Sequence, residues 1–149
     1  MRFFPRLERV LLTFWVGGLW AIGYIAVPSL FFTLDDRQLA GELAGQMLKS
    51  IQVIGLACGL LLLCGLFYEI GRQFIRQWRC WLLLAMLLLT VLAVFIIQPM
   101  MVDLKAHGPI LKGTELAAEF GRLHGMASVL YLLNSIMGLA LITFTLRQK

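Results

Sequence analysis

The chain has 149 residues, of which 60% are hydrophobic and only 14% are charged, and its formal net charge is +5. Soluble domains average about 25% charged residues, so this composition disfavours a water-soluble helical bundle. The mean hydropathy of +0.87 favours an integral membrane protein instead. Little of the chain is left for a separate soluble domain, and we expect one domain over residues 1–149.

Four apolar blocks follow one another along the chain, at residues 10–32, 51–70, 81–102 and 123–146. Because a helix rises about 1.5 Å per residue and the hydrocarbon core is about 30 Å thick, about 20 apolar residues suffice to cross it. The sequence therefore predicts an all-α fold, a bundle of four transmembrane helices. The first block is too long for the core of a signal peptide, so we expect it to be retained as the first helix.

The connection after the first block carries a helix-start signal. Thr33 followed by Asp36 resembles an N-terminal cap, and Asp35 adds negative charge where the helix dipole favours it. Apolar residues then recur at helical spacing from Leu39 to Leu48. This pattern predicts a short amphipathic helix in the first outer loop, which lies at the membrane interface or stacks onto the second span.

The connection before the fourth block contains turn residues and a second cap. Gly108 and Pro109 are typical of a turn, and Thr114 is a suitable N-cap with Glu115 in the first helical turn. We expect the fourth helix to begin near Glu115, outside the membrane, and to pack there against the first-loop helix. No internal repeat is evident in the sequence.

Basic residues are unevenly distributed between the two sides of such a bundle. Both termini and the link between the second and third blocks carry Arg2, Arg6, Arg9, Arg72, Arg76, Arg79, Arg147 and Lys149. The other side carries Arg37, Lys49, Lys105, Lys112 and Arg122 over two longer loops, together with most of the acidic residues. The positive-inside rule then predicts cytoplasmic termini, and we expect the protein in the inner (plasma) membrane. Anionic headgroups account for the basic rim, so we expect membrane lipids as partners and no nucleic acid.

Polar residues gather at the predicted outward ends of the first, third and fourth helices. Pro28 and Pro99 each remove a backbone donor and free a carbonyl one turn earlier, in lipid where no water compensates. Two such defects at one depth predict an outward-facing polar cavity. Its candidate ligand-binding residues are Tyr24, Pro28, Gln98, Asp103, His124, Ser128 and Tyr131.

Several of these polar residues also have a structural interpretation. A histidine at a helix end near the headgroups, such as His124, can be interfacial, and Ser128 can bond the backbone of its own helix. His107 lies in a loop, where a histidine without a role is common. Asn134 lies near mid-membrane, and we expect it to form an interhelical hydrogen bond with Thr90 of the third helix, at similar depth.

Common catalytic and metal-binding motifs are absent from the sequence. It contains no phosphate-binding glycine loop, no G-x-S-x-G elbow and no H-E-x-x-H pair, so we expect no catalytic residue and no metal ligand set. Two histidines, one of them in a loop, make a weak transition-metal or haem site. No acidic or basic residue lies deep within a span, which argues against an ordinary proton-driven pump.

Two motifs resemble a known family. The first, G-G-x(9)-P-x-x-F, ends at Phe31, and the second, F-x-x-x-H-G-x-x-S, runs from Phe120 to Ser128. Together they resemble the bacterial branch of the transmembrane-protein-205-like family, a domain of unknown function. This resemblance implies a four-helix integral membrane protein and no particular reaction. The first motif is also similar to helices of copper-resistance D-type proteins and of the haem-carrying membrane protoporphyrinogen oxidase, a similarity that implies haem or copper. Those proteins use histidines within early helices, whereas the first helix here has none, so His124 is the intramembrane histidine left as a candidate ligand.

Three functions are compatible with these observations. The first is a non-enzymatic membrane protein, oligomeric, that binds or passes a small ligand or ion at its outward-facing polar pocket. The second is an accessory or scaffold subunit that holds a larger membrane complex together. The third is a haem- or copper-dependent membrane oxidoreductase with His124 as an axial ligand. The sequence favours the first, without a cofactor.

Overall fold

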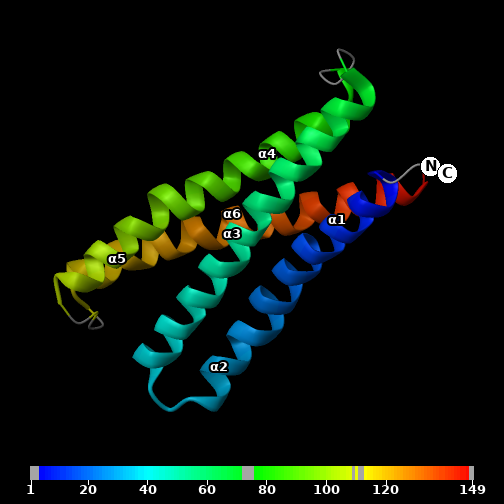
Figure 1. Ribbon diagram of the computed structural model, residues 1–149. Helices are drawn as coiled ribbons and strands as arrows, with labels where there is room; N and C mark the ends of the chain where they lie inside the picture. Colours follow the sequence, from blue (N-terminus) through cyan, green and yellow to red (C-terminus); the bar gives the residue numbers. More distant parts are fainter. Residues whose placement is uncertain (1–3, 72–75, 109, 111–112, 148–149) are drawn as a thin grey trace.

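Figure 1 shows the computed structural model, which describes residues 4–71, 76–108, 110 and 113–147. Helices make up nearly all of these residues, and no strand occurs among them. Four helical segments are long and apolar enough to cross a membrane. The prediction of an all-α fold with four candidate spans is therefore confirmed. Arg2, Arg72, Lys112 and Lys149, which the orientation argument uses, lie outside the described residues.

Two of the spans are interrupted by a π-helical turn, and the other two are continuous. In chain order the elements are α1 (Phe4–Ala21), η1 (Ile22–Ala26), α2 (Val27–Thr33), α3 (Arg37–Ile70), α4 (Trp78–Leu92), η3 (Ala93–Ile97), α5 (Gln98–Ala106) and α6 (Glu115–Arg147). The first and third spans thus have the same construction, an α-helix, a five-residue π turn and a short second helix. Each is followed by one long helix, so the fold consists of two hairpins of the same design.

The π turns occur where proline would disturb an ordinary helix. Pro28 and Pro99 are each the second residue of the helix that follows the π turn. Proline has no N–H, and its ring crowds the carbonyl one turn earlier. The wider turn keeps the neighbouring donors paired, because the N–H of Val27 reaches the carbonyl of Ile22 and that of Gln98 reaches the carbonyl of Ala93.

Each helix of the bundle has two neighbours. α1 and α4 both pack against α3 and α6, and among the described residues the backbones of α1 and α4 are not adjacent. Beyond the π turns the two hairpins separate, as Figure 1 shows at its lower and left ends. α2 contacts α3 but not α5 or α6, and α5 contacts α6 but not α2 or α3. The end of the bundle away from the termini therefore consists of two arms.

Glycines allow close contact between helices in the middle of the bundle. Gly55 and Gly59 of α3 pack on the indole of Trp15, which is completely buried. A Cβ at Gly55 would collide with that ring, and a Cβ at Gly59 would collide with Leu87 of α4. Gly138 of α6 packs in the same way on Val16 of α1, whose methyl carbon would lie 2.8 Å from an added Cβ. Small residues at helix crossings commonly have this role in membranes.

The second span begins earlier than its apolar block. The side chain of Asp36 caps α3 by accepting hydrogen bonds from the N–H groups of Gln38 and Leu39, at 2.8 and 3.2 Å. The residues expected to form a separate amphipathic helix are instead the first turns of α3. The buried side chains of Ala40 and Ala44 continue the helix face that packs inward, so no break is required between loop and span.

The fourth span begins where the sequence predicts. α6 starts at Glu115, and the hydroxyl of Thr114 accepts a hydrogen bond from the N–H of Ala117 at 3.2 Å. We expected its first turns to pack against the first-loop helix, which is the start of α3, but they pack against α5 instead. The reason is that α3 begins in the other arm, beside α2.

An ion pair joins the two interrupted spans near the chain termini. The guanidinium of Arg79 in α4 contacts the carboxylate of Glu8 in α1, and these side chains are only 15% and 11% exposed. Arg79 was expected to be a cation of the basic rim. It lies largely buried between the helices instead, because Glu8 faces it across the bundle.

Candidate functional site

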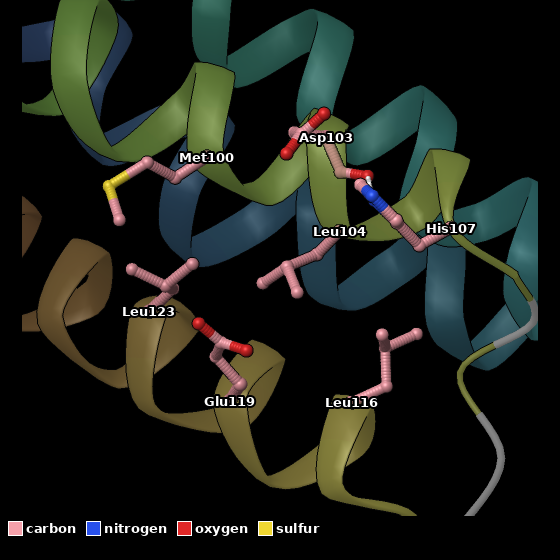
Figure 2. Close-up of a pocket in the computed structure, with 7 residues that line it drawn as sticks. All are labelled: Met100, Asp103, Leu104, His107, Leu116, Glu119 and Leu123. Carbon is pink, nitrogen blue, oxygen red and sulfur yellow. Dashed lines mark hydrogen bonds between the residues drawn. The ribbon is translucent and has the colours of Figure 1, made fainter.

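A hollow of about 350 Å³ lies between α5 and α6, in the arm shown at the left of Figure 1. α5 and α6 present side chains spaced three or four residues apart, which share one face of a helix. Figure 2 shows the two faces opposite each other. The lining residues are Met100, Asp103, Leu104, His107, Leu116, Glu119 and Leu123.

The local sequence places both walls of the hollow. Pro99 marks the start of α5 after the π turn, and the cap at Thr114 starts α6 before its apolar block. His107 follows the last turn of α5, and its Nδ1 lies 2.8 Å from the carbonyl oxygen of Asp103. A carbonyl only accepts, so Nδ1 is the donor and holds the ring at the edge of the hollow. In the neutral ring Nε2 is then an acceptor.

The hollow combines negative charge with apolar surface. Asp103 comes from α5 and Glu119 from α6, and none of the seven lining residues is lysine or arginine. Lys105, a neighbour in sequence, lies over the ring of Phe120 with its Nζ 5.6 Å from the ring centroid. The four apolar lining residues form the rest of the wall. This arrangement suits a ligand with a positive group and an apolar part.

Of the seven residues predicted to bind a ligand, the hollow contains only Asp103. His124 and Ser128 are exposed on α6 and do not line it. The Ser128 hydroxyl donates to the carbonyl of His124 at 2.8 Å, and the His124 ring stacks on Phe120 with centroids 6.2 Å apart.

Two more of the predicted residues meet at the contact between the first span and α6. The rings of Tyr24 and Tyr131 lie edge to face, with centroids 6.1 Å apart. The Tyr131 hydroxyl donates to the carbonyl of Leu19 at 2.6 Å, in the turn before η1. Gly23 leaves the space that the Tyr131 ring occupies. This contact holds α6 against the interrupted first span.

The last two predicted residues belong to the interruptions themselves. Pro28 is in the first turn of α2, and Gln98 is the first residue of α5. The predicted residues thus lie in several places, because the two arms separate beyond the π turns and the helix ends do not converge on one cavity.

A layer of buried polar residues crosses the middle of the bundle. The amide nitrogen of Asn134 donates to the hydroxyl of Thr90 at 2.9 Å, the pair expected from their depth, and Thr90 donates to the carbonyl of Met86 at 2.8 Å. We use the name polar layer for the buried residues Gln52, Thr90, Asn134 and Ser135. Sequence reasoning missed Gln52, although a glutamine inside an apolar span is itself a signal.

Metal ligands do not gather in the part of the chain that the structure describes. No group of three or more His, Cys, Asp or Glu residues there could hold a metal ion.

The fold and the hollow define a four-span helical membrane protein with a small acidic and apolar recess in one arm. A family model described as a domain of unknown function, DUF4149, matches residues 10–109, and the chain belongs to this family. No curated protein matches the chain. No solved structure matches it either. The family match includes the α5 wall of the hollow and ends before α6.

Proposed function

We propose that this multi-pass membrane protein binds a small organic cation in the hollow between α5 and α6, at the outward face of the bacterial inner membrane. The observation that carries the proposal is that Asp103 and Glu119, from the two helices that form the walls, line an otherwise mostly apolar recess. Binding pockets for small molecules have volumes of roughly 300–1,000 Å³, and the hollow is at the lower end of this range.

The ligand chemistry follows from the lining. An ammonium group suits the two carboxylates, and the His107 ring, in its neutral form, offers an acceptor at Nε2. An apolar body suits Met100 and Leu104. A free alkylamine and the amine headgroup of a membrane lipid share this chemistry. The positive-inside argument supports the outward orientation, since the hollow is at the end opposite the basic termini.

Titration of the purified protein with tetraethylammonium tests the proposal. We expect saturable binding that weakens roughly 2- to 5-fold in Asp103→Asn and in Glu119→Gln, because exposed ion pairs contribute about 0.5–1 kcal/mol. Glu115→Gln is the matched control, since Glu115 is on the same helix and does not line the hollow. Unsaturable binding by the wild type, or equal affinities in all variants, would refute the proposal.

Nanodiscs separate the two sources of the amine. If the natural ligand is a lipid headgroup, ethylammonium, a primary amine like that headgroup, binds more weakly in discs that contain phosphatidylethanolamine than in discs of phosphatidylcholine alone. The bulkier headgroup of phosphatidylcholine carries its charge on a trimethylated nitrogen that donates no hydrogen bond. Equal affinity in the two kinds of disc indicates a free amine.

A second candidate function is that of an accessory subunit in a membrane complex. It rests on glycines that face open space, since nothing lies within 4 Å of a Cβ built at Gly17, Gly121 or Gly125. Such faces allow a helix of another chain, or of a second copy, to approach closely. Gly125→Leu should leave the isolated fold intact and abolish any stoichiometric association seen on purification from native membranes. If association survives both Gly121→Leu and Gly125→Leu, this face of α6 is not the contact.

A further inference from the structure

The polar layer lies at one depth because close contacts set the register of the helices. Gly55 of α3 packs on Trp15, which brings Gln52, one turn earlier in α3, to the level of the turn after Trp15 in α1. Gly138 of α6 packs on Val16, and Asn134 lies one turn earlier in α6. The hydrogen bond to Thr90 brings α4 to the same level.

Three polar atoms at or beside this layer have no partner. Oε1 of Gln52, Oδ1 of Asn134 and Nε1 of Trp15 are all buried and form no hydrogen bond with the described residues. Gln52 is 7% exposed, Asn134 is 4% exposed and Trp15 is completely buried. Unpaired polar groups are costly in an apolar surrounding, and lipid offers them no donor or acceptor.

The orientation of the Asn134 amide is set by its neighbours. Its nitrogen donates to the hydroxyl of Thr90, whose own hydrogen is used toward the carbonyl of Met86. Turning the amide over would place two oxygens against each other without a hydrogen between them. Oδ1 of Asn134 therefore remains an acceptor that requires an outside donor.

The layer also lies where the two hairpins meet, just before the π turns. Thr90 is in the last turn of α4 before η3, and Leu19 has the matching place in α1 before η1. α6 bonds both positions, with Asn134 on Thr90 and Tyr131 on the carbonyl of Leu19. Interrupted spans at the interface of two repeats commonly carry polar binding sites near the middle of the membrane.

We propose that the polar layer is a binding site for internal water, held by Gln52, Asn134 and Trp15. The two amide oxygens require O–H or N–H donors, and the indole N–H requires an acceptor. Water supplies both, whereas an ammonium ion has no acceptor. Leu19 and Met86, which flank the layer, are both completely buried, and such a packed core suits a molecule as small as water. The site is separate from the hollow between α5 and α6 and does not depend on its proposed ligand.

Whether the variant Gln52→Met has a lower or a higher Tm than the wild type tests this site. Gln52→Met keeps the length of the side chain and removes its polar atoms. If water occupies the layer, the variant loses bonded partners, and we expect the Tm in detergent to fall by about 2–4 °C. If the layer is dry, the same change removes an unsatisfied oxygen and the Tm rises. Gln46→Met is the control, because Gln46 is an exposed glutamine of the same helix. An unchanged or higher Tm for Gln52→Met overturns the proposal.

A measurement on the unmodified protein gives a second, independent test. In protein labelled with ¹⁵N at the tryptophan indoles, we expect a nuclear Overhauser effect between water and the Nε1–H of Trp15, assigned by its loss in Trp15→Phe. The sample contains no glycerol or other hydroxylated additive, so the signal can come only from water. Absence of this effect overturns the proposal even where Gln52→Met does not fold.

Discussion

The ion pair between Glu8 and Arg79 provides a sharp test of the packing near the termini. Glu8→Gln removes the only anion that contacts Arg79 among the described residues, and Nε of Arg79 already has no partner there. Breaking a buried pair by removing one member costs about 3–5 kcal/mol, because the other charge stays buried. Arg79 is 15% exposed and Glu8 is 11% exposed. Some water therefore reaches both, and we expect a loss of about 2–3 kcal/mol.

A double-mutant cycle measured by unfolding in detergent separates the pair from the individual side chains. Glu8→Gln and Arg79→Met should each destabilise the protein, and the double variant should recover most of the loss, because no charge is then left alone. Glu69→Gln is the control, since Glu69 is an exposed residue at the end of α3. If Glu8→Gln costs no more than Glu69→Gln, water screens the pair and the buried contact between α1 and α4 is refuted.

Three further predictions follow from single contacts. Asp36→Ala removes the cap of α3, so stability should fall by about 1 kcal/mol in the same unfolding assay, and no loss would mean that the first turns of α3 are frayed. Tyr131→Phe leaves the carbonyl of Leu19 without its donor and should cost about 0.5–1.5 kcal/mol, whereas an unchanged Tm would show that the ring alone holds this contact. We expect no Soret band in wild-type protein expressed with excess haem, and no change of the spectrum in His124→Ala, because His124 stacks on Phe120 and His107 lies elsewhere, at the hollow. A Soret band that is present in the wild type and lost in this variant would support a haem-dependent oxidoreductase.

The candidate site was only partly predictable. Asp103 was recognised as a polar residue at a helix end, and it lines the hollow. Glu119 was not assigned to the site, because it joins Asp103 at the hollow only when α6 packs beside α5. His107 was interpreted as a loop residue without a role, whereas it directly follows α5, one turn after Asp103. Local signals did locate two helix starts, because Asp36 and Thr114 accept hydrogen bonds from backbone N–H groups two or three residues ahead. The helix after Asp36 was expected to be short, however, and it is the beginning of the second span. Capping requires no contact with distant parts of the chain.

The two hairpins of the same design are a second feature that could not be predicted from local signals in the sequence. The sequence places Pro28 and Pro99 at a similar depth, but it does not show that both follow a π turn, because the flanking side chains differ. The two π turns become comparable only when the backbone is seen. Gln52 likewise is recognised as part of the polar layer only from the contact of Gly55 with Trp15, because this contact brings Gln52 to the depth of Asn134.

The sequence by itself determined the class of this protein, the number of its spans and the start of its long helices. These depend on the transfer of about 20 consecutive residues into lipid and on hydrogen bonds within a few residues. Only the tertiary structure decided which helices are neighbours, that the arms separate beyond the π turns, and that Asp103 and Glu119 line the same hollow. Such features depend on side-chain packing between segments far apart in the chain, where close approach at a few glycines outweighs any local preference.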